Sequence, residues 1–144
     1  MFVHRRSISI EWGDCDPAGI VFHPRYFAMF DASTAELFRA ALGCTKFEMM
    51  QRFDFAGFPM VDTGARFGVP SRFGDEVTIE SRIARLGRSS FDVEHRLMRG
   101  SVLAIEAHEK RVWVKRHPDD PDRIEGTPIP QEVRAALSRD DQQN

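Results

Sequence analysis

A single long helical pattern, set between alternating runs of apolar and polar residues, is the feature that most limits how this chain can fold. Between Pro24 and Leu42, apolar residues recur at helical spacing. They are Phe27, Phe30, Leu37, Phe38 and Ala41. The polar residues between them can face water: Arg25, Ser33, Glu36 and Arg39. Pro24 suits the first turn, where its missing N–H needs no partner, and Gly43 suits the end of the helix. We predict one long helix here.

Five alternating runs, which are typical of β-strands with one buried face, surround this helix. One run precedes the helix at residues 4–12, and four follow it at 59–69, 76–86, 90–99 and 102–116. In the run at 59–69, the odd-numbered residues should face inward. The last run changes from odd to even apolar positions, which predicts a bulge or a strand buried on both faces. This order predicts an α+β fold in which the last four strands form an antiparallel meander and the helix covers one face of the sheet.

Two segments outside these elements differ in composition. A short helical or irregular piece at 46–52 leads into a flap or connection at 56–59. After residue 118 the chain becomes rich in Pro and Asp, then offers a short helix at 130–137 and a polar end with almost nothing to bury. We predict one domain at 1–118 and a C-terminal extension at 119–144, whose last residues are disordered.

The overall charge and the cysteine count exclude some classes of protein. The net charge is −2, and no block of like charge forms a basic arm, so nucleic acid is not an expected partner. No apolar run approaches the roughly 20 residues that span a bilayer, and the N-terminus lacks the apolar segment of a signal peptide. Two cysteines are too few for a disulfide framework and show no metal-ligand spacing. We expect a cytoplasmic protein without membrane insertion.

The connection between the first strand and the helix concentrates the reactive side chains. It contains Asp14, Cys15, Asp16 and His23. A carboxylate can activate water or attack a carbonyl, but aspartates also cap helices and brace turns. The acidic neighbours of Cys15 disfavour its thiolate, which favours a packing role. The start of the following helix offers unsatisfied backbone N–H groups and the positive end of the helix dipole, which suit an oxyanion.

The segment Glu11-Trp-Gly-Asp-Cys-Asp-Pro-Ala-Gly-Ile-Val-Phe-His-Pro-Arg-Tyr26 closely resembles the signature of the 4-hydroxybenzoyl-CoA thioesterase group of hot dog fold enzymes. The strand entry Phe73-Gly-Asp-Glu-Val-Thr-Ile-Glu80 and the turn Gly87-Arg-Ser-Ser-Phe91 also resemble that group, so the resemblance covers most of residues 5–116. It implies a hot dog fold, in which a five-stranded antiparallel sheet wraps around one long helix. It also implies a homodimer or a homotetramer made of two dimers, with active sites between subunits.

The resemblance assigns roles to two residues of the connection. Asp16 matches the catalytic aspartate of the family, as nucleophile or general base, and Asp14 is better explained as a loop brace. His23 occupies the position whose backbone N–H polarises the thioester. The aroyl-CoA branch of the family has a tyrosine there, whereas a histidine resembles the short-chain thioesterases of the Tol-Pal-associated branch.

The resemblance also places substrate contacts elsewhere in the chain. Nucleotide and phosphate contacts of coenzyme A fall around the turn with Arg88, Ser89 and Ser90, with Arg85 close by, although ordinary solvated turn charges explain the same residues. Weaker phosphate candidates are Arg66, Arg72, Lys115 and Arg116. We predict that one stretch forms a wall of the acyl pocket: Gly57, Phe58, Pro59 and Met60. The other aromatic residues are better explained as core.

The sequence therefore favours an acyl-CoA thioesterase that releases an aromatic acid, of the benzoyl or hydroxybenzoyl type, and coenzyme A. No cofactor or metal site is expected, because coenzyme A is part of the substrate. Three alternatives remain: a short-chain aliphatic acyl-CoA thioesterase, a hydratase or dehydratase of the same fold, and a non-catalytic acyl-CoA binding protein. The hydratases rely on a catalytic histidine with a carboxylate on the helix, and this chain shows no such pairing.

Overall fold

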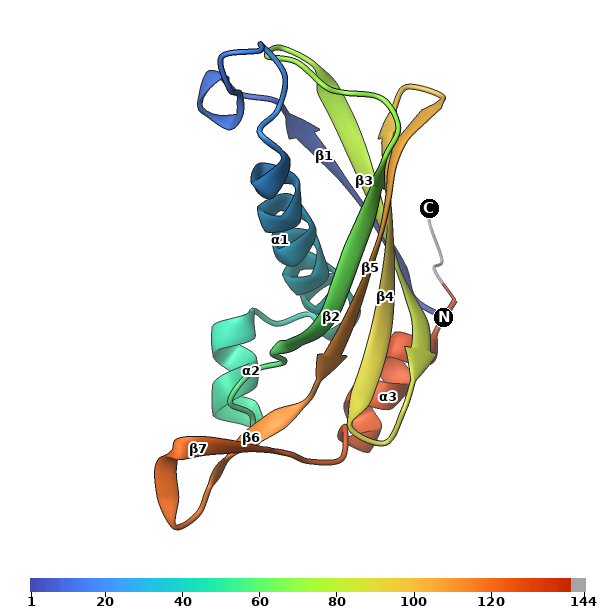
Figure 1. Cartoon of the computed structure of the whole chain (residues 1–144). Helices are drawn as coiled ribbons and strands as arrows, with labels where there is room; N and C mark the ends of the chain where they lie inside the picture. Colours follow the sequence, from blue (N-terminus) through green and yellow to red (C-terminus); the bar gives the residue numbers. More distant parts are fainter. Residues whose placement is uncertain (141–144) are drawn as a thin grey trace.

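A curved antiparallel sheet packs against one long helix (Figure 1). In the computed structural model, which describes residues 1–140, this helix is α1 (His23–Leu42). The sheet contains, in spatial order, β1 (Val3–Ser9), β3 (Glu76–Leu86), β4 (Ser90–Arg99), β5 (Val102–Val112) and β2 (Met60–Phe67). All neighbours in the sheet are antiparallel. This is the predicted α+β arrangement, with the helix on one face of the sheet.

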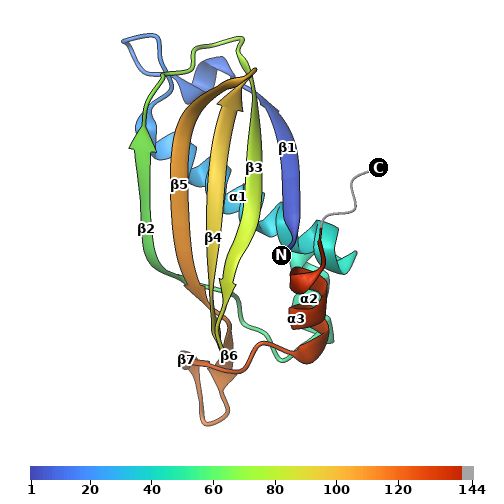
Figure 2. The same cartoon turned by 90° about the vertical axis from the view of Figure 1, so that its right-hand side faces the viewer.

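The position of β2 differs from the predicted meander. Only β3, β4 and β5 follow one another as neighbours, whereas β2 lies at the edge of the sheet beside β5 (Figure 2). An alternating pattern shows that a strand has one buried face, but it does not identify the neighbouring strand. The prediction of a four-stranded meander is therefore wrong in this one connection.

The predicted last run consists of two strands that belong to two sheets. β5 ends at Val112, and β6 (Val114–His117) pairs with β7 (Asp120–Gly126) to form a separate hairpin. Trp113, between β5 and β6, is buried. The register of β5 against β4 shifts near its start, but the change of parity at 112–114 marks the passage into the hairpin. The sequence pattern did not predict a strand at 120–126.

The apolar core divides into two clusters along α1. The first cluster contains residues of the C-terminal half of α1, of α2 (Lys46–Arg52) and of α3 (Gln131–Ser138). The second contains residues of the N-terminal half of α1 and of the loop before it. Ser33, which was predicted to face water, is buried. Its hydroxyl is satisfied inside the protein, because it donates to the Met29 carbonyl (2.7 Å) and accepts from Arg6 Nε (3.1 Å).

The C-terminal segment is packed against the rest of the chain. Ile129, Val133 and Leu137 are buried in the first cluster, and Ile129 N–H donates to the Arg88 carbonyl (2.9 Å). The division of the chain at residue 118 stays a prediction, and α3 lies where a short helix was expected. Disorder was predicted for the end of the chain, and residues 141–144 of that end lie outside the described residues. Within residues 1–140, none of the helices has the length and apolarity that crossing a membrane requires.

Candidate functional site

The loop before α1 is held by backbone and carboxylate hydrogen bonds. At a short 3-10 helix, η1 (Trp12–Asp14), the Glu11 N–H donates to Asp14 Oδ2 (2.9 Å). The Phe22 N–H donates to the Asp14 carbonyl (2.8 Å) and so closes the loop. Asp14 thus has the loop-bracing role that the sequence favoured for it.

Asp16 lies in the same loop but has a freer carboxylate. Its Oδ1 accepts a hydrogen bond from the Ala18 N–H (2.8 Å), and its backbone is tied to Ile20 and Gly19 by two further bonds (3.0 and 2.9 Å). Gly19 adopts φ = 81°, which a residue with a side chain rarely adopts, so the tight turn depends on glycine. Among residues 1–140, no donor bonds Oδ2 of Asp16. The half-buried side chain is therefore oriented by one oxygen while the other stays available.

The first turn of α1 leaves a backbone donor beside this loop. Phe22, the N-cap residue, makes no side-chain cap, and Pro24 follows in the first turn. Within the described part of the chain, the His23 N–H has no acceptor, as is usual for the start of a helix. The exposed His23 ring packs edge-on against Phe22 (5.4 Å between centroids) and lies 6.4 Å from the Phe67 ring.

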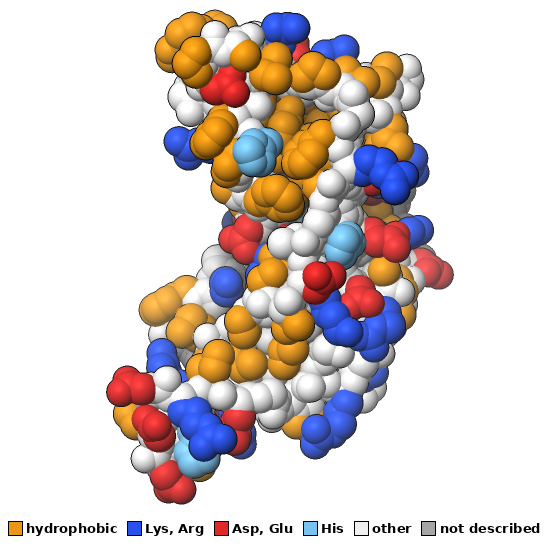
Figure 3. Space-filling model, viewed as in Figure 1, with side chains coloured by type: hydrophobic (Ala, Val, Ile, Leu, Met, Phe, Trp, Pro, Cys, Tyr) orange, Lys and Arg blue, Asp and Glu red, His pale blue; other side chains and the backbone are white. Residues whose placement is uncertain are grey.

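An apolar cavity of about 280 Å³ opens at the same end of α1. Its lining comes from the loop, from α1, from β5 and from the segment that ends β2: Ile20, Val21, His23, Tyr26, Phe67, Gly68, Val69, Pro70 and Ile105. In Figure 3, apolar side chains and a histidine gather in this region between α1 and β2. Sequence analysis missed the contribution of residues 67–70, because Phe67 and Val69 were interpreted only as core positions of a strand.

The predicted coenzyme A turn connects β3 and β4 at the opposite end of the sheet (Figure 2). Arg85 is already bonded there, to Asp92 (3.0 Å) and to the Ser90 hydroxyl (3.1 Å). The carbonyls of Arg88 and Ser89 accept from Ile129 and Trp113 N–H groups, which fix the backbone of the turn. The Arg88 side chain is exposed, and no acidic side chain within residues 1–140 pairs with it.

The predicted pocket wall also lies at that opposite end, where β2 begins. Phe58 is buried, and its ring stacks on Phe38 (4.8 Å), so its side chain belongs to the core. Gly57 bridges to Val114, whereas Pro59 and Met60 are exposed. Within one chain, this stretch and the coenzyme A turn lie at the opposite end of the sheet from the loop before α1 (Figure 1).

A buried polar network between α1 and the sheet was missed by sequence analysis. Glu109 accepts from Thr34 Oγ1 (2.5 Å) and Arg111 Nε (2.9 Å), and its second oxygen lies 3.4 Å from His95 Nε2. His95 Nδ1 in turn lies 2.7 Å from the Ser81 hydroxyl. The signal was present, because Ser81, His95, Glu109 and Arg111 occupy the inward parity of their strands.

Charges compensate one another within this network. Burial raises the pKa of Glu109, but the contacts with His95, Arg111 and Thr34 outweigh burial and lower it to about 2. Burial lowers the pKa of Arg111, but its bonds to Glu109 and Asp31 raise it above the ordinary value. Glu109 is therefore a carboxylate and Arg111 a cation at neutral pH.

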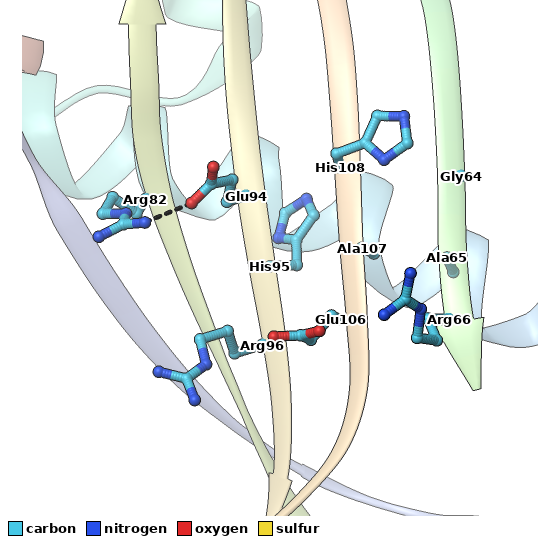
Figure 4. Close-up of a pocket in the computed structure, with 10 residues that line it drawn as sticks. All are labelled: Gly64, Ala65, Arg66, Arg82, Glu94, His95, Arg96, Glu106, Ala107 and His108. Atoms are coloured by element: carbon cyan, nitrogen blue, oxygen red, sulfur yellow. Dashed lines mark hydrogen bonds and ion pairs between the residues drawn. The ribbon is translucent and has the colours of Figure 1, made fainter. Parts of the chain in front are cut away.

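A larger hollow of about 810 Å³ lies on the outer face of the sheet and is strongly charged (Figure 4). Arg82 and Glu94 form an ion pair there, and Glu106 stands in register between Arg66 and Arg96. These exposed charges alternate in sign across neighbouring strands. No group of three potential metal ligands occurs among residues 1–140.

The fold and this loop together define a hot dog protein with a carboxylate at the start of its long helix. Residues 10–137 match the family model of the thioesterase-like superfamily, so the chain belongs to that superfamily. It is 34% identical over 127 residues to 4-hydroxybenzoyl-CoA thioesterase of Pseudomonas sp. (strain CBS-3), covering 84% of this chain and 87% of the relative. It is 24% identical to acyl-CoA thioesterase YbgC of Haemophilus influenzae, covering 90% of both chains.

Solved structures that resemble this chain also include thioesterases. A mutant 4-hydroxybenzoyl-CoA thioesterase in complex with 4-hydroxybenzoyl-CoA matches with a TM-score of 0.88 and 27% identity, over 96% of this chain and all of that one. A gentisyl-coenzyme A thioesterase matches with a TM-score of 0.79 and 32% identity, over 94% of this chain and all of that one. The predicted family, the hot dog fold and the enzyme class, an acyl-CoA thioester hydrolase, are confirmed.

Proposed function

We propose that this enzyme hydrolyses the thioester of an aromatic acyl-CoA, with Asp16 as its catalytic carboxylate. One observation carries the proposal. A carboxylate with one oxygen bonded and one available lies in the loop that leads to a free helix N–H and borders an apolar cavity. Thioester hydrolysis needs a carboxylate, an oxyanion donor and a dry place for the acyl group.

In this proposal, the carbonyl oxygen of the thioester lies at the start of α1 and accepts from the His23 N–H. The positive end of the helix dipole stabilises the charge that develops on that oxygen. Asp16 Oδ2 either attacks the carbonyl carbon or takes a proton from the water that attacks it. If Asp16 takes the proton, the C–S bond breaks, that proton passes to the leaving sulfur to give coenzyme A thiol, and the acyl group leaves as a carboxylic acid. If Asp16 attacks, the C–S bond breaks to give a mixed anhydride and the coenzyme A thiolate; water then hydrolyses the anhydride to the carboxylic acid and protonated Asp16, which returns its proton to the thiolate.

The volume and lining of the cavity support a small aromatic acyl group. Its volume of about 280 Å³ is at the low end of ligand pockets, which is roughly 300 Å³, so a long acyl chain fits poorly. The rings of His23, Tyr26 and Phe67 can contact an aromatic acyl group edge-on or face-on. The relatives named for 4-hydroxybenzoyl-CoA and gentisyl-CoA support the same substrate class.

A short-chain aliphatic acyl-CoA is the second candidate. The observation that favours it is His23, which stands where the aroyl branch has a tyrosine, together with the similarity to the acyl-CoA thioesterase YbgC. A short chain would also fit the cavity. The two candidates differ in the acyl group and share the same reaction.

A homodimer would bring the separated parts of the site together. β2 is an edge strand with Val61 and Phe67 exposed, and an exposed edge can pair with the same edge of a second copy. A two-fold axis makes such pairing antiparallel and places the start of one β2 beside the end of the other. We therefore propose that residues 57–60 of one subunit border the Asp16 loop of its partner. A tetramer of two such dimers is a further proposal.

Coenzyme A is proposed to bind with its phosphates near Arg88, whose guanidinium is exposed above a fixed turn. Ser89 and Ser90 complete this turn. Arg85 is the weaker candidate, because Asp92 and Ser90 already hold its guanidinium. Both cysteines are free thiols, which supports the proposed cytoplasmic location.

The test is a thiol-release assay on benzoyl-, 4-hydroxybenzoyl-, phenylacetyl- and butyryl-CoA with the wild-type enzyme and Asp16→Asn. We expect turnover of at least one aromatic ester and a loss of about 10³-fold in kcat for the variant, within the range for removal of a catalytic acid–base group. Asp122→Asn, on the distant hairpin, is the control and should keep wild-type rates. Near-normal rates for Asp16→Asn would exclude its catalytic role, and binding without thiol release from any ester would favour a binding protein.

A further inference from the structure

Arg111 joins three separate segments of the chain by hydrogen bonds. From β5, its Nη2 donates to Asp31 Oδ1 on α1 (2.7 Å), and its Nη1 donates to the Phe58 carbonyl (3.1 Å). Its Nε donates to Glu109 (2.9 Å), and its guanidinium carbon lies 5.4 Å from the centre of the Phe58 ring. The side chain is only 5% exposed, although Asp31 beside it is 64% exposed.

The buried network holds this guanidinium in place. Glu109 fixes the Nε end and is itself bonded by Thr34, which comes from the same helix as Asp31. A planar guanidinium with all three nitrogens engaged has few other orientations that keep its acceptors satisfied. The Phe58 carbonyl is therefore held at a fixed distance from both the helix and the sheet.

We propose that Arg111 is a positioning residue that fixes the Gly57–Met60 stretch as an acyl-pocket wall and so determines acyl selectivity. The inference rests on the proposed thioesterase function and on the proposed dimer. Asp16 is held by its own hydrogen bonds at the other end of α1, where the His23 N–H is the proposed oxyanion donor. Arg111 therefore affects which acyl group fits the partner's site, and it leaves the bond-breaking chemistry unchanged.

The first experiment compares Arg111→Gln and Arg111→Lys with the wild type on benzoyl- and butyryl-CoA, well below each variant's melting temperature. For Arg111→Gln we expect KM for benzoyl-CoA to rise about tenfold with kcat nearly unchanged, since a misplaced pocket contact changes discrimination by roughly 10–200-fold. Lysine has one ammonium where arginine has a fork, so Arg111→Lys should restore the selectivity in part. If the Gln variant does not fold, the Lys variant decides.

Arg82→Gln is the matched control, because it removes an exposed arginine that pairs with Glu94 on the outer face of the sheet. It should leave the selectivity unchanged. Hydrogen exchange supplies a second readout: in the Arg111 variants, the peptide covering residues 55–62 should exchange faster than in the wild type, while exchange in β3 and β4 stays unchanged. A fall of kcat/KM by the same factor for both esters, or exchange raised equally over the whole sheet, would reduce Arg111 to a structural residue and overturn the proposal.

A mixed dimer tests whether the wall acts on the partner's site. One subunit carries Asp16→Asn and the other Arg111→Gln, with two affinity tags to isolate the mixed species. The single working site then combines Asp16 of one subunit with an intact wall from the other, so wild-type selectivity is expected. Altered selectivity would overturn action across the dimer. A wild-type enzyme inactive on all thioesters would instead refute the proposed function, and failure to form dimers would refute the assembly.

Discussion

Asp14 and Asp16 are two positions apart, and the loop gives their carboxylates different roles. Asp14 is engaged as a cap, since its Oδ2 accepts the Glu11 N–H. Asp16 is engaged through Oδ1 alone. Residue type and spacing do not separate the two residues, whereas the hydrogen bonds of the turn at Gly19 do. The resemblance to the family identified Asp16, and the geometry supplies a physical reason for that choice.

Glu109 places a negative charge inside the core, between α1 and the sheet. Its pKa is lowered to about 2 in the folded protein, compared with about 4.5 when unfolded. A depressed carboxylate contributes stability above its unfolded pKa, and this contribution is lost as the pH falls from about 4.5 to about 2. Glu109→Gln leaves Arg111 without its buried anion, so we expect a loss on the order of 3 kcal/mol at pH 7, measured by urea unfolding.

The same variant predicts a pH signature. Because Glu109 becomes protonated in both states at low pH, the difference between wild type and Glu109→Gln should shrink as the pH falls below about 4.5. Glu94→Gln, on the exposed outer face, should cost less than about 1 kcal/mol at any pH. A stability difference that is independent of pH would show that the lost packing, and not the charge, is responsible.

At the scale of elements, the two ends of α1 differ in their caps. The first turn has no side-chain cap, whereas the last turn has a backbone cap. Gly43 ends the helix in the left-handed conformation (φ = 71°), and its N–H donates to the Arg39 carbonyl. The first turn has no side-chain cap and borders the cavity. A helix that places its free N–H groups at a cavity is suited to an anionic group there.

Much of this architecture could be predicted from the sequence, and the exceptions have physical reasons. Periodicity and turn residues gave α1, β3 and β4 nearly to the residue, because each has one apolar face and clear ends. The place of β2 in the sheet and the β6–β7 hairpin were not predicted. The alternation of apolar and polar residues along a strand does not depend on which strand pairs with it. The buried network was missed because polar residues at inward positions look like interruptions of the pattern.

Helix α3 gives an element-scale prediction. Leu137 is fully buried in the first cluster, and α3 packs against α1 and β3. Leu137→Ala should cost roughly 2–5 kcal/mol in thermal or urea unfolding, through lost burial and the cavity left behind. Ile124→Ala, which shortens an exposed side chain on β7, should change stability by no more than about 0.5 kcal/mol. Equal effects of the two variants would show that the C-terminal segment is an appendage rather than part of the core.

At the scale of the whole molecule, the two faces of the sheet differ in what they can tolerate. On the outer face, charges alternate in register across the sheet, from Arg5 and Glu80 through Arg96 to Glu106 and Arg66. Opposite charges on neighbouring strands stabilise each other and remain hydrated. On the inner side, the edge strand β2 leaves Phe67 exposed, and its ring contacts His23, Tyr26 and Phe27 of α1.

This asymmetry predicts that the β2 edge, and not the outer face, joins two subunits. Light scattering should give at least twice the mass of one 16.5 kDa chain for the wild type. Val61→Asp places a charge at the proposed junction, where burial of an unpaired charge costs several kcal/mol, so it should shift the enzyme to monomers and abolish thiol release together. Val102→Asp, at another exposed valine at the start of β5, should alter neither mass nor activity. A monomeric variant that keeps full activity would mean that one chain contains a complete site, and the Gly57–Met60 stretch would then have no place in it.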